Sequence, residues 1–375
     1  MNASSELPPA AEAIAWNVDL LTQILVSLPA KSLIQFTSVS KQWRSLISDS
    51  QFATKHHCRN PRPLISGVFV CWESLFESFK CVSLQGDPTG PSLDYILKQT
   101  GSMHRTKIIG SCNGLLLSDC TFKRLRYFVC NPTTQVCKLI PEPHTRLVSF
   151  WSEALFVFYP SKSPHYKVVI LTYDYVGKPY VQIDIYSSKS ASWKQLRRVC
   201  YMSIARPVFC SGVIYWLYNG NVISGFDVDS DKLIKKKLPL KVPHNLRLIE
   251  YFGECDGRLI LIQIDESCDM VLDESFHMVF DILETDDDYS HWIVKYRVNL
   301  VPLQLVSRDL DTYPEYSVKS VLKGEEKDFA LVLAFRGKTV YYNLKCNTLN
   351  VLHDVPGSFH YDTTACSFIQ TLHLI

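Results

Sequence analysis

Apolar residues recur at helical spacing near the start of the sequence. Val18, Leu21, Leu25 and Leu28 are separated by three or four positions, which places them on one face of a helix. Asn17 precedes this stretch, and its side chain is suited to cap backbone N–H groups that lack partners in a first turn. The pattern therefore predicts a helix that begins after residue 17.

Two further helices are expected directly after the first. Pro29 ends the first helix and suits the start of the second, whose apolar face lies within Leu33–Phe36. Ser40 is a candidate cap for a third helix with apolar positions in Trp43–Ile47, and Asp49–Ser50 marks its end. Three helices in so few residues bury little of their own apolar surface. That surface is expected to meet either the rest of the chain or another protein.

From Leu64 onward the pattern changes to short apolar runs that are broken by Gly, Asn, Asp and Ser. These runs alternate with a period of two or are wholly apolar, which is typical of strands. Tyr95–Lys98 offers at most one turn of helix. The runs are Val68–Trp72, Leu115–Leu117, Lys167–Thr172, Val181–Tyr186, Val213–Tyr218, Leu259–Ile262, Met278–Ile282 and Thr339–Leu344. We therefore expect an all-β domain over residues 64–375.

Two sequence elements repeat within this β-rich region. One is a polar or small pair followed by Gly and an apolar strand, at Gly114, Gly212, Gly257 and, more loosely, Gly337. The other is a strand, a polar turn and a second strand. Its copies begin at Phe128, Ile183, Phe226, Phe280 and Tyr342.

The copies indicate repeats of about 40 to 60 residues, each with a few strands, and such repeats are typical of propeller blades. Residues 64–375 at roughly 50 residues per blade predict six blades, with seven as the next count. The run Ala365–Leu374 is expected to pair with the first blade near Leu64 and close the ring. An irregular β-sandwich is the alternative architecture.

Composition and charge exclude several classes of function. The formal net charge is only +2, so the chain lacks the strongly basic character of duplex nucleic-acid binders. No basic and apolar leader opens the sequence, and no apolar run is long enough to span a membrane. Thirteen scattered cysteines without a C-x-x-C pair are interpreted as reduced thiols. We therefore expect a cytoplasmic or nuclear protein without nucleic-acid or membrane partners.

The candidates for chemistry each have a simpler structural interpretation. Gly110–Gly114 fits a cysteine form of the nucleophile elbow around Cys112, but a strand rather than a helix follows it. His56–Cys58 is suggestive of metal ligands, yet without a second half it is better interpreted as a solvated helix end. Asp286–Asp288 is interpreted as a hairpin tip. We expect no catalytic residue, no metal and no cofactor.

The helical region resembles an F-box. The resemblance is carried by Leu28–Leu33 (Leu-Pro-Ala-Lys-Ser-Leu) and by Val39–Ile47 (Val-Ser-Lys-Gln-Trp-Arg-Ser-Leu-Ile) at the spacing of that family. One departure is that Trp16 and Asn17 stand where the family usually has Leu-Pro. The implied organisation is a tail over 1–15 that is disordered, a three-helix F-box over 16–57 and a linker over 58–63.

The F-box resemblance implies binding to a Skp-type adaptor, and through it to a cullin. The motif positions implied as contact or contact-supporting residues are Leu28, Pro29, Leu33, Val39 and Trp43. Leu21, Ile24, Leu25 and Phe36 fit either the internal core or the contact surface.

The β-rich remainder resembles the kelch-like F-box-associated domain. Gly110–Leu116 (Gly-Ser-Cys-Asn-Gly-Leu-Leu) and Asn131–Thr134 (Asn-Pro-Thr-Thr) carry this second resemblance. Together the two resemblances imply a non-catalytic substrate receptor of an SCF-type ubiquitin ligase, with an unknown target protein. The alternatives are a propeller that binds a small ligand, and a diverged F-box protein that acts outside a ligase.

Overall fold

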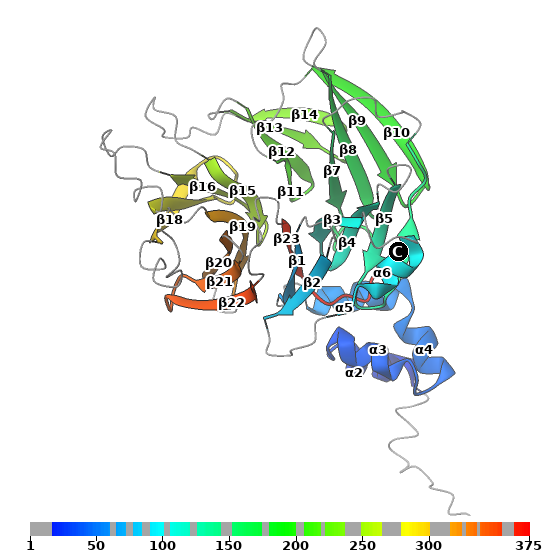
Figure 1. The fold of residues 1–375 in the computed structure, drawn as a ribbon. Coiled ribbons are helices and arrows are strands. Elements are labelled where there is room, and N and C mark those ends of the chain that lie inside the picture. Colours follow the sequence, from blue (N-terminus) through cyan, green and yellow to red (C-terminus); the bar gives the residue numbers. More distant parts are fainter. Residues whose placement is uncertain are drawn as a thin grey trace, which may run out of the picture.

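The computed structural model describes the protein at residues 17–60, 65–72, 78–84, 91–100, 106–120, 126–143, 152–174, 180–199, 206–218, 222–236, 249–264, 279–300, 316–324, 328–335, 338–354 and 364–375. Residues 17–60 form a helical module below a ring of sheets (Figure 1). Its helices are α2 (Val18–Leu25), α3 (Ala30–Phe36), α4 (Lys41–Ile47) and α5 (Ser50–Arg59). The expected tail over 1–15 and Trp16 lie outside the described residues.

The module has one helix more than the sequence pattern predicts. Asn17 and Ser40 accept hydrogen bonds from first-turn N–H groups of α2 and α4, as expected. Asp49 directly follows the end of the third helix, α4, as expected, and its Oδ1 also caps α5 by accepting from the Gln51 N–H at 2.8 Å. An aspartate after one helix is also a good cap for the next. The three-helix prediction is therefore wrong, and α5 continues to Arg59, across the expected boundary at residue 57.

The described strands form six antiparallel sheets, the blades of a propeller. From the innermost strand outward they are blade 1 with β23 (Thr364–Phe368), β1 (Gly67–Trp72) and β2 (Ser78–Ser83); blade 2 with β3 (Thr106–Cys112), β4 (Leu115–Cys120), β5 (Arg126–Asn131) and β6 (Val136–Leu139); blade 3 with β7 (Ser152–Val157), β8 (Lys167–Asp174), β9 (Tyr180–Ser187) and β10 (Ser192–Val199); blade 4 with β11 (Val208–Cys210), β12 (Val213–Tyr218), β13 (Val222–Asp227) and β14 (Lys232–Lys236); blade 5 with β15 (Ile249–Cys255), β16 (Arg258–Ile264), β17 (Val279–Thr285) and β18 (Trp292–Asn299); and blade 6 with β19 (Tyr316–Lys323), β20 (Phe329–Phe335), β21 (Lys338–Asn343) and β22 (Thr348–Asp354).

The ring is closed by pairing between distant parts of the chain. Strand β23 pairs antiparallel with β1, and Gly67 lies opposite Phe368. The innermost strands contact one another in the order β23, β3, β7, β11, β15, β19 and back to β23. The predicted closure is confirmed for residues 364–368 only, because residues 369–375 leave the sheet. A closed ring of six blades excludes the β-sandwich alternative.

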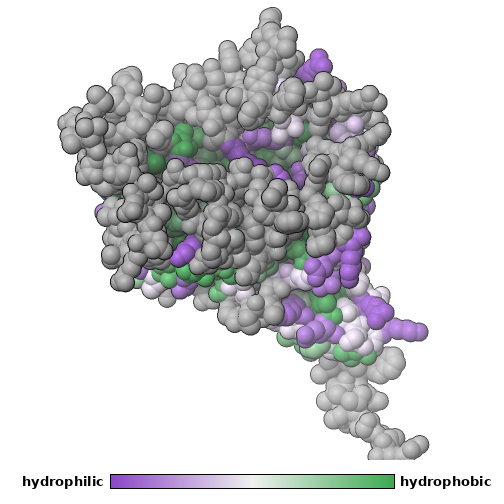
Figure 2. All heavy atoms as spheres, in the orientation of Figure 1, coloured by the Kyte–Doolittle hydropathy of each residue, from purple (hydrophilic) through white to green (hydrophobic). Residues whose placement is uncertain are grey.

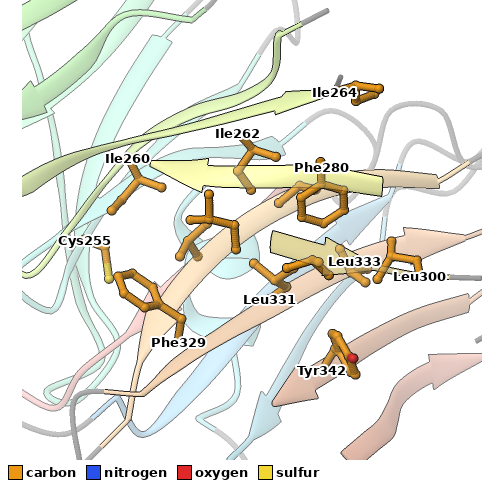
Figure 3. Packing of buried hydrophobic residues seen from close by; sticks show 14 of the residues in the cluster. Cys255, Ile260, Ile262, Ile264, Phe280, Leu300, Phe329, Leu331, Leu333 and Tyr342 are labelled. Carbon is orange, nitrogen blue, oxygen red and sulfur yellow. The ribbon is translucent and has the colours of Figure 1, made fainter. Parts of the chain in front are cut away.

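Each pair of neighbouring blades encloses a hydrophobic cluster. In the cluster between blades 5 and 6, Ile260 and Ile262 come from β16 and Leu331 and Leu333 from β20 (Figure 3). The second strand of a blade, such as β16 or β20, contacts one neighbouring blade on each of its faces. Its side chains are therefore buried on both sides of the sheet. This burial explains the wholly apolar runs in the sequence. Each such Leu or Ile stabilises the ring by roughly 1.5–3 kcal/mol.

The Gly-strand repeat marks the hairpin between the first two strands of a blade. Asn113-Gly114, Ser211-Gly212 and Asp256-Gly257 all have positive φ at both positions, as a type I′ turn requires. Gly337, the looser fourth copy, lies outside the described residues. The strand expected after it is β21, which is the third strand of blade 6 and not the second.

The strand-turn-strand repeat is confirmed as the hairpin between the third and outermost strands of blades 2 to 6. Each of these turns contains one residue other than Gly with positive φ; they are Gln135, Ala191, Asp231, Tyr289 and Asn347. Asn131, Asp227 and Asn343 precede the turns of blades 2, 4 and 6. Each accepts two hydrogen bonds from backbone N–H groups of its turn. The same local chemistry is therefore reused around the ring.

Two details differ from the sequence predictions. Helix α6 (Asp94–Thr100) is longer than the single turn expected at Tyr95–Lys98. Cys130 and Cys137 lie opposite each other on β5 and β6 and form a disulfide, so the expectation of thirteen reduced thiols is wrong for this pair. Their spacing across one hairpin brings them together. No helix in the described ranges has the length and hydrophobicity to cross a bilayer.

Candidate functional site

The helical module exposes large apolar side chains. Val18, Leu20, Ile24 and Val39 have exposed fractions of 44–59%. Figure 2 shows hydrophobic surface along the lower side of this module, away from the propeller. Apolar groups in this arrangement lose contact with water only when another protein covers them. The module therefore presents a candidate docking surface.

The five residues expected to bind an adaptor have different environments. Pro29 and Val39 are exposed, and Leu28 and Trp43 are half-buried. Leu33 is fully buried, so its side chain supports the surface from below and is not itself available for contact. The motif could not distinguish these cases, because it records residue identity and not which face of α3 meets the core.

The four residues that the sequence could not assign to core or surface also differ in their burial. Leu21 and Leu25 are buried, whereas Ile24 is about half exposed at 48%. Phe36 is half-buried, and its ring meets the Trp43 ring edge-on with centroids 5.7 Å apart. The exposure of Val18 was not predicted. The sequence feature that indicates this exposure is the width of the apolar stripe on the first helix, which is greater than one short helix can bury.

A segment from the other end of the described chain completes the core of the module. We call residues Gln370–Ile375, which follow β23, the strap; in Figure 1 it is the red segment beside α5. Leu372 is only 3% exposed and belongs to the same cluster as Leu21, Leu33 and Phe52. The Gln370 side chain accepts a hydrogen bond from the Lys31 N–H at 3.2 Å, across 339 residues of sequence.

Blade 2 holds the strap from its other side. Nδ2 of Asn131 donates hydrogen bonds to the carbonyl oxygens of Thr371 and His373, at 3.1 and 2.9 Å. The Thr371 N–H donates in turn to Oγ1 of Thr133 at 3.0 Å. Blade 3 adds a ring contact: the rings of His373 and Phe158, the residue after β7, meet edge-to-face with centroids 5.0 Å apart. The strap therefore contacts the helical module and the propeller at the same time.

The closest approach of the strap explains one glycine. A Cβ on Gly114 would lie 2.6 Å from the Ile369 carbonyl oxygen and from Cγ2 of Thr371. At the equivalent turns, the nearest atoms to such a Cβ are 3.7 Å away for Gly212 and 3.9 Å for Gly257. The turn of blade 2 thus has two reasons to be glycine, its positive φ and the strap.

Histidines surround the joint between module and strap. His56 is buried, and its Nε2 lies 2.9 Å from the Leu28 carbonyl oxygen. The His57 ring lies 5.4 Å from the His373 ring. The interpretation of His56–Cys58 as a solvated helix end is therefore wrong for His56, whereas His57 is half-buried and Cys58 is exposed near the end of α5. Across the described ranges, no group of His, Cys, Asp and Glu side chains has the arrangement of a metal site.

A polar groove of about 480 Å³ lies between blades 5 and 6. The Glu284 carboxylate, 4% exposed, accepts from Nζ of Lys323 at 3.0 Å and pairs with Nζ of Lys295 at 3.1 Å. Burial alone would raise the pKa of Glu284, but these two ammonium groups outweigh it and lower the pKa. The Arg258 guanidinium pairs with Asp287. The charges of the groove thus largely neutralise one another and connect the two blades.

The candidate nucleophile Cys112 directly precedes the repeat turn Asn113-Gly114, so the segment is a repeat turn, as predicted. It ends β3, a strand follows it, and its Sγ donates to the Phe158 carbonyl oxygen at 3.1 Å. Burial raises the pKa of this thiol to about 12. A thiol with so high a pKa is almost wholly protonated at neutral pH and is a poor nucleophile. Asp286–Asp288 lies in the β17–β18 turn, as predicted.

Comparison with known proteins identifies both parts of the chain. The F-box domain family matches residues 16–55, and the F-box associated beta propeller domain family matches residues 78–369. The protein therefore belongs to the F-box proteins with an F-box-associated β-propeller. The helical module is the F-box, and the two resemblances found in the sequence are confirmed.

Curated relatives come from Arabidopsis thaliana. F-box protein At5g07610 is 27% identical, over 92% of this chain and 88% of its own length. F-box protein At5g49610 is 29% identical, over 66% and 72%. Among solved structures, a protein from Lactobacillus plantarum is 9% identical with a TM-score of 0.40, over 77% of this chain and 82% of that chain. A TM-score this low adds nothing to the assignment.

Proposed function

We propose that this F-box protein is a substrate receptor of an SCF-type ubiquitin ligase. Its F-box would bind a Skp-type adaptor, and through it a cullin, while the propeller binds a target protein. The observation that carries the proposal is the set of exposed apolar side chains on the F-box, opposite a closed propeller scaffold. The eight free thiols among the described cysteines favour a cytoplasmic or nuclear location.

The proposed mechanism needs no bond chemistry from this chain. Holding the target and the ubiquitin-loaded enzyme in one complex raises their effective concentration, which accelerates transfer to a target lysine. In the proposed complex Leu28, Pro29, Val39 and Trp43 contact the adaptor, and buried Leu33 supports them. Trp43 is held in place by its edge-on contact with Phe36.

Adaptor binding tests this function directly. Val39→Asp and Leu20→Asp place a charge on the exposed surface without touching the core. Each is expected to weaken binding by ten-fold or more, because charge buried in an interface without a partner is costly. Val294→Asp is the matched control, since Val294 is 58% exposed on outermost strand β18. The measurement is calorimetric titration with a Skp-type adaptor.

Two outcomes would contradict the proposal. Equal affinities for the F-box variants and the control would show that the adaptor binds elsewhere. No binding by a well-folded wild type would indicate a diverged F-box protein that acts outside a ligase.

A further inference from the structure

We propose that the strap is a clamp that completes the F-box and fixes it against blade 2. Leu372 and Asn131 then act as positioning residues for adaptor binding, although neither is on the exposed surface of the F-box. The inference goes beyond the proposed function, because it describes how the F-box is held whatever its partner.

The F-box depends on the strap because its own core is small. Its helices have only seven to ten residues each, and helices of this length are marginal without tertiary contacts. Leu372 joins the buried residues that these helices share, among them Leu25 and Ile47. Removing it would leave a cavity at the point where all of them meet.

Blade 2 offers the strap contacts that the equivalent described turns of blades 4, 5 and 6 do not. The side-chain amide of Asn131 is the feature that matters. Its Oδ1 accepts from the turn, as Asp227 and Asn343 do in blades 4 and 6, while its Nδ2 donates to two strap carbonyls. Gly114 supplies the space beside it. One face of blade 2 is thus shaped for the strap.

Because Oδ1 of Asn131 serves the turn and Nδ2 serves the strap, one substitution can remove the contact with the strap and keep the turn. Asn131→Asp keeps the oxygen that serves the turn, as Asp227 shows, but replaces the donor with an acceptor that faces two carbonyl oxygens. Asn343→Asp is the matched control, since Asn343 has the same role in its own turn without a strap. Only the first change is expected to release the strap.

A second pair of variants tests the other side of the clamp. Leu372→Asp places a charge in the F-box core, whereas Leu374→Asp changes a side chain that is 50% exposed two positions later. Leu372→Met keeps a flexible apolar side chain of similar volume and is expected to restore wild-type behaviour.

The readouts are limited proteolysis, thermal unfolding and adaptor titration of the whole chain. For Asn131→Asp and Leu372→Asp we expect cleavage within residues 17–60 to be at least ten times faster. We expect adaptor affinity to fall at least ten-fold, with the melting temperature of the propeller unchanged. Both controls and Leu372→Met should match wild type.

Wild-type proteolysis in both Asn131→Asp and Leu372→Asp would overturn the clamp. So would faster cleavage in Asn343→Asp equal to that in Asn131→Asp, because the effect would then come from a turn alone. If Leu372→Asp also unfolds the propeller, the proteolysis rate of Asn131→Asp alone determines whether the clamp exists. If the wild type binds no adaptor, the proposed function fails, and the proteolysis still tests the clamp.

Discussion

His373 is the titratable side chain of the strap that meets both halves of the protein. Burial, together with His57 and His56, lowers its pKa to about 4. Its Nε2 has no hydrogen-bond partner among the described residues. A proton on this ring is therefore favoured only when the strap leaves its site.

The strap is expected to loosen as the pH falls. Between pH 6.5 and about 4 the released state binds more protons than the folded state, so the strap loses stability with acid, on the order of 3 kcal/mol. The pKa of His57 is lowered as well, which acts in the same direction. Proteolysis of the F-box should accelerate between pH 7.5 and 5.

His373→Phe is the variant that assigns this pH dependence. A phenyl ring keeps the edge contact with Phe158 and carries no proton. We expect most of the acid sensitivity to disappear, with some remaining from His57. An unchanged pH profile would show that the sensitivity arises elsewhere.

At the scale of single residues, the sequence predicted which residues belong to the F-box motif better than it predicted how exposed each side chain is. The motif selected Leu33 and Val39 together, yet one is fully buried and the other is 59% exposed. Which of two apolar residues reaches water depends on the segment that covers the helix. Here that segment includes Leu372, which no local pattern near Leu33 reveals.

Among elements, the turns and strands were the most predictable. Asn-Gly, Ser-Gly and Asp-Gly turns carry their own backbone requirement, so the hairpins of blades 2, 4 and 5 are visible in the sequence. Helix α5 was missed because Asp49 was interpreted only as the end of α4, although it also caps α5. The Cys130–Cys137 pairing was missed because it depends on register between β5 and β6.

Neighbouring blades are also joined by charge, and Glu284 is the central residue. Glu284→Ala leaves the ammonium groups of Lys323 and Lys295 without their shared carboxylate. Since both lysines are partly solvated, we expect a loss of about 2 kcal/mol in the free energy of unfolding. Urea unfolding measures this value.

Asp287→Ala is the control for that comparison. Asp287 lines the same groove, but its side chain is 87% exposed where it pairs with Arg258. Its loss should change stability by less than about 0.5 kcal/mol. Equal losses for the two variants would contradict the role given to buried Glu284.

For the whole molecule, β23 and the strap have separable tasks. A variant that stops after Asp354 lacks the innermost strand of blade 1, so the ring cannot close. We expect it to lose cooperative thermal unfolding. A variant that stops after Ile369 keeps β23 and should unfold like wild type in the propeller. The circular dichroism signal of the strands during heating distinguishes the two.

Closure was predictable at this scale because the repeat count left an unpaired apolar run after the last blade. The strap was not predictable, since Leu372 continues the same apolar pattern as the strand before it. Only the structure shows that the chain leaves the sheet after Phe368 and turns to the F-box.

The strap also has a consequence for the order of biosynthesis. The ribosome makes Lys31 early and Gln370 only 339 residues later. At about 5–20 residues per second, that interval is on the order of half a minute. During it the F-box helices exist without Leu372 in their core. A nascent or prematurely terminated chain therefore offers an incomplete F-box, and under the proposed function assembly of the ligase would favour chains whose propeller has already been made.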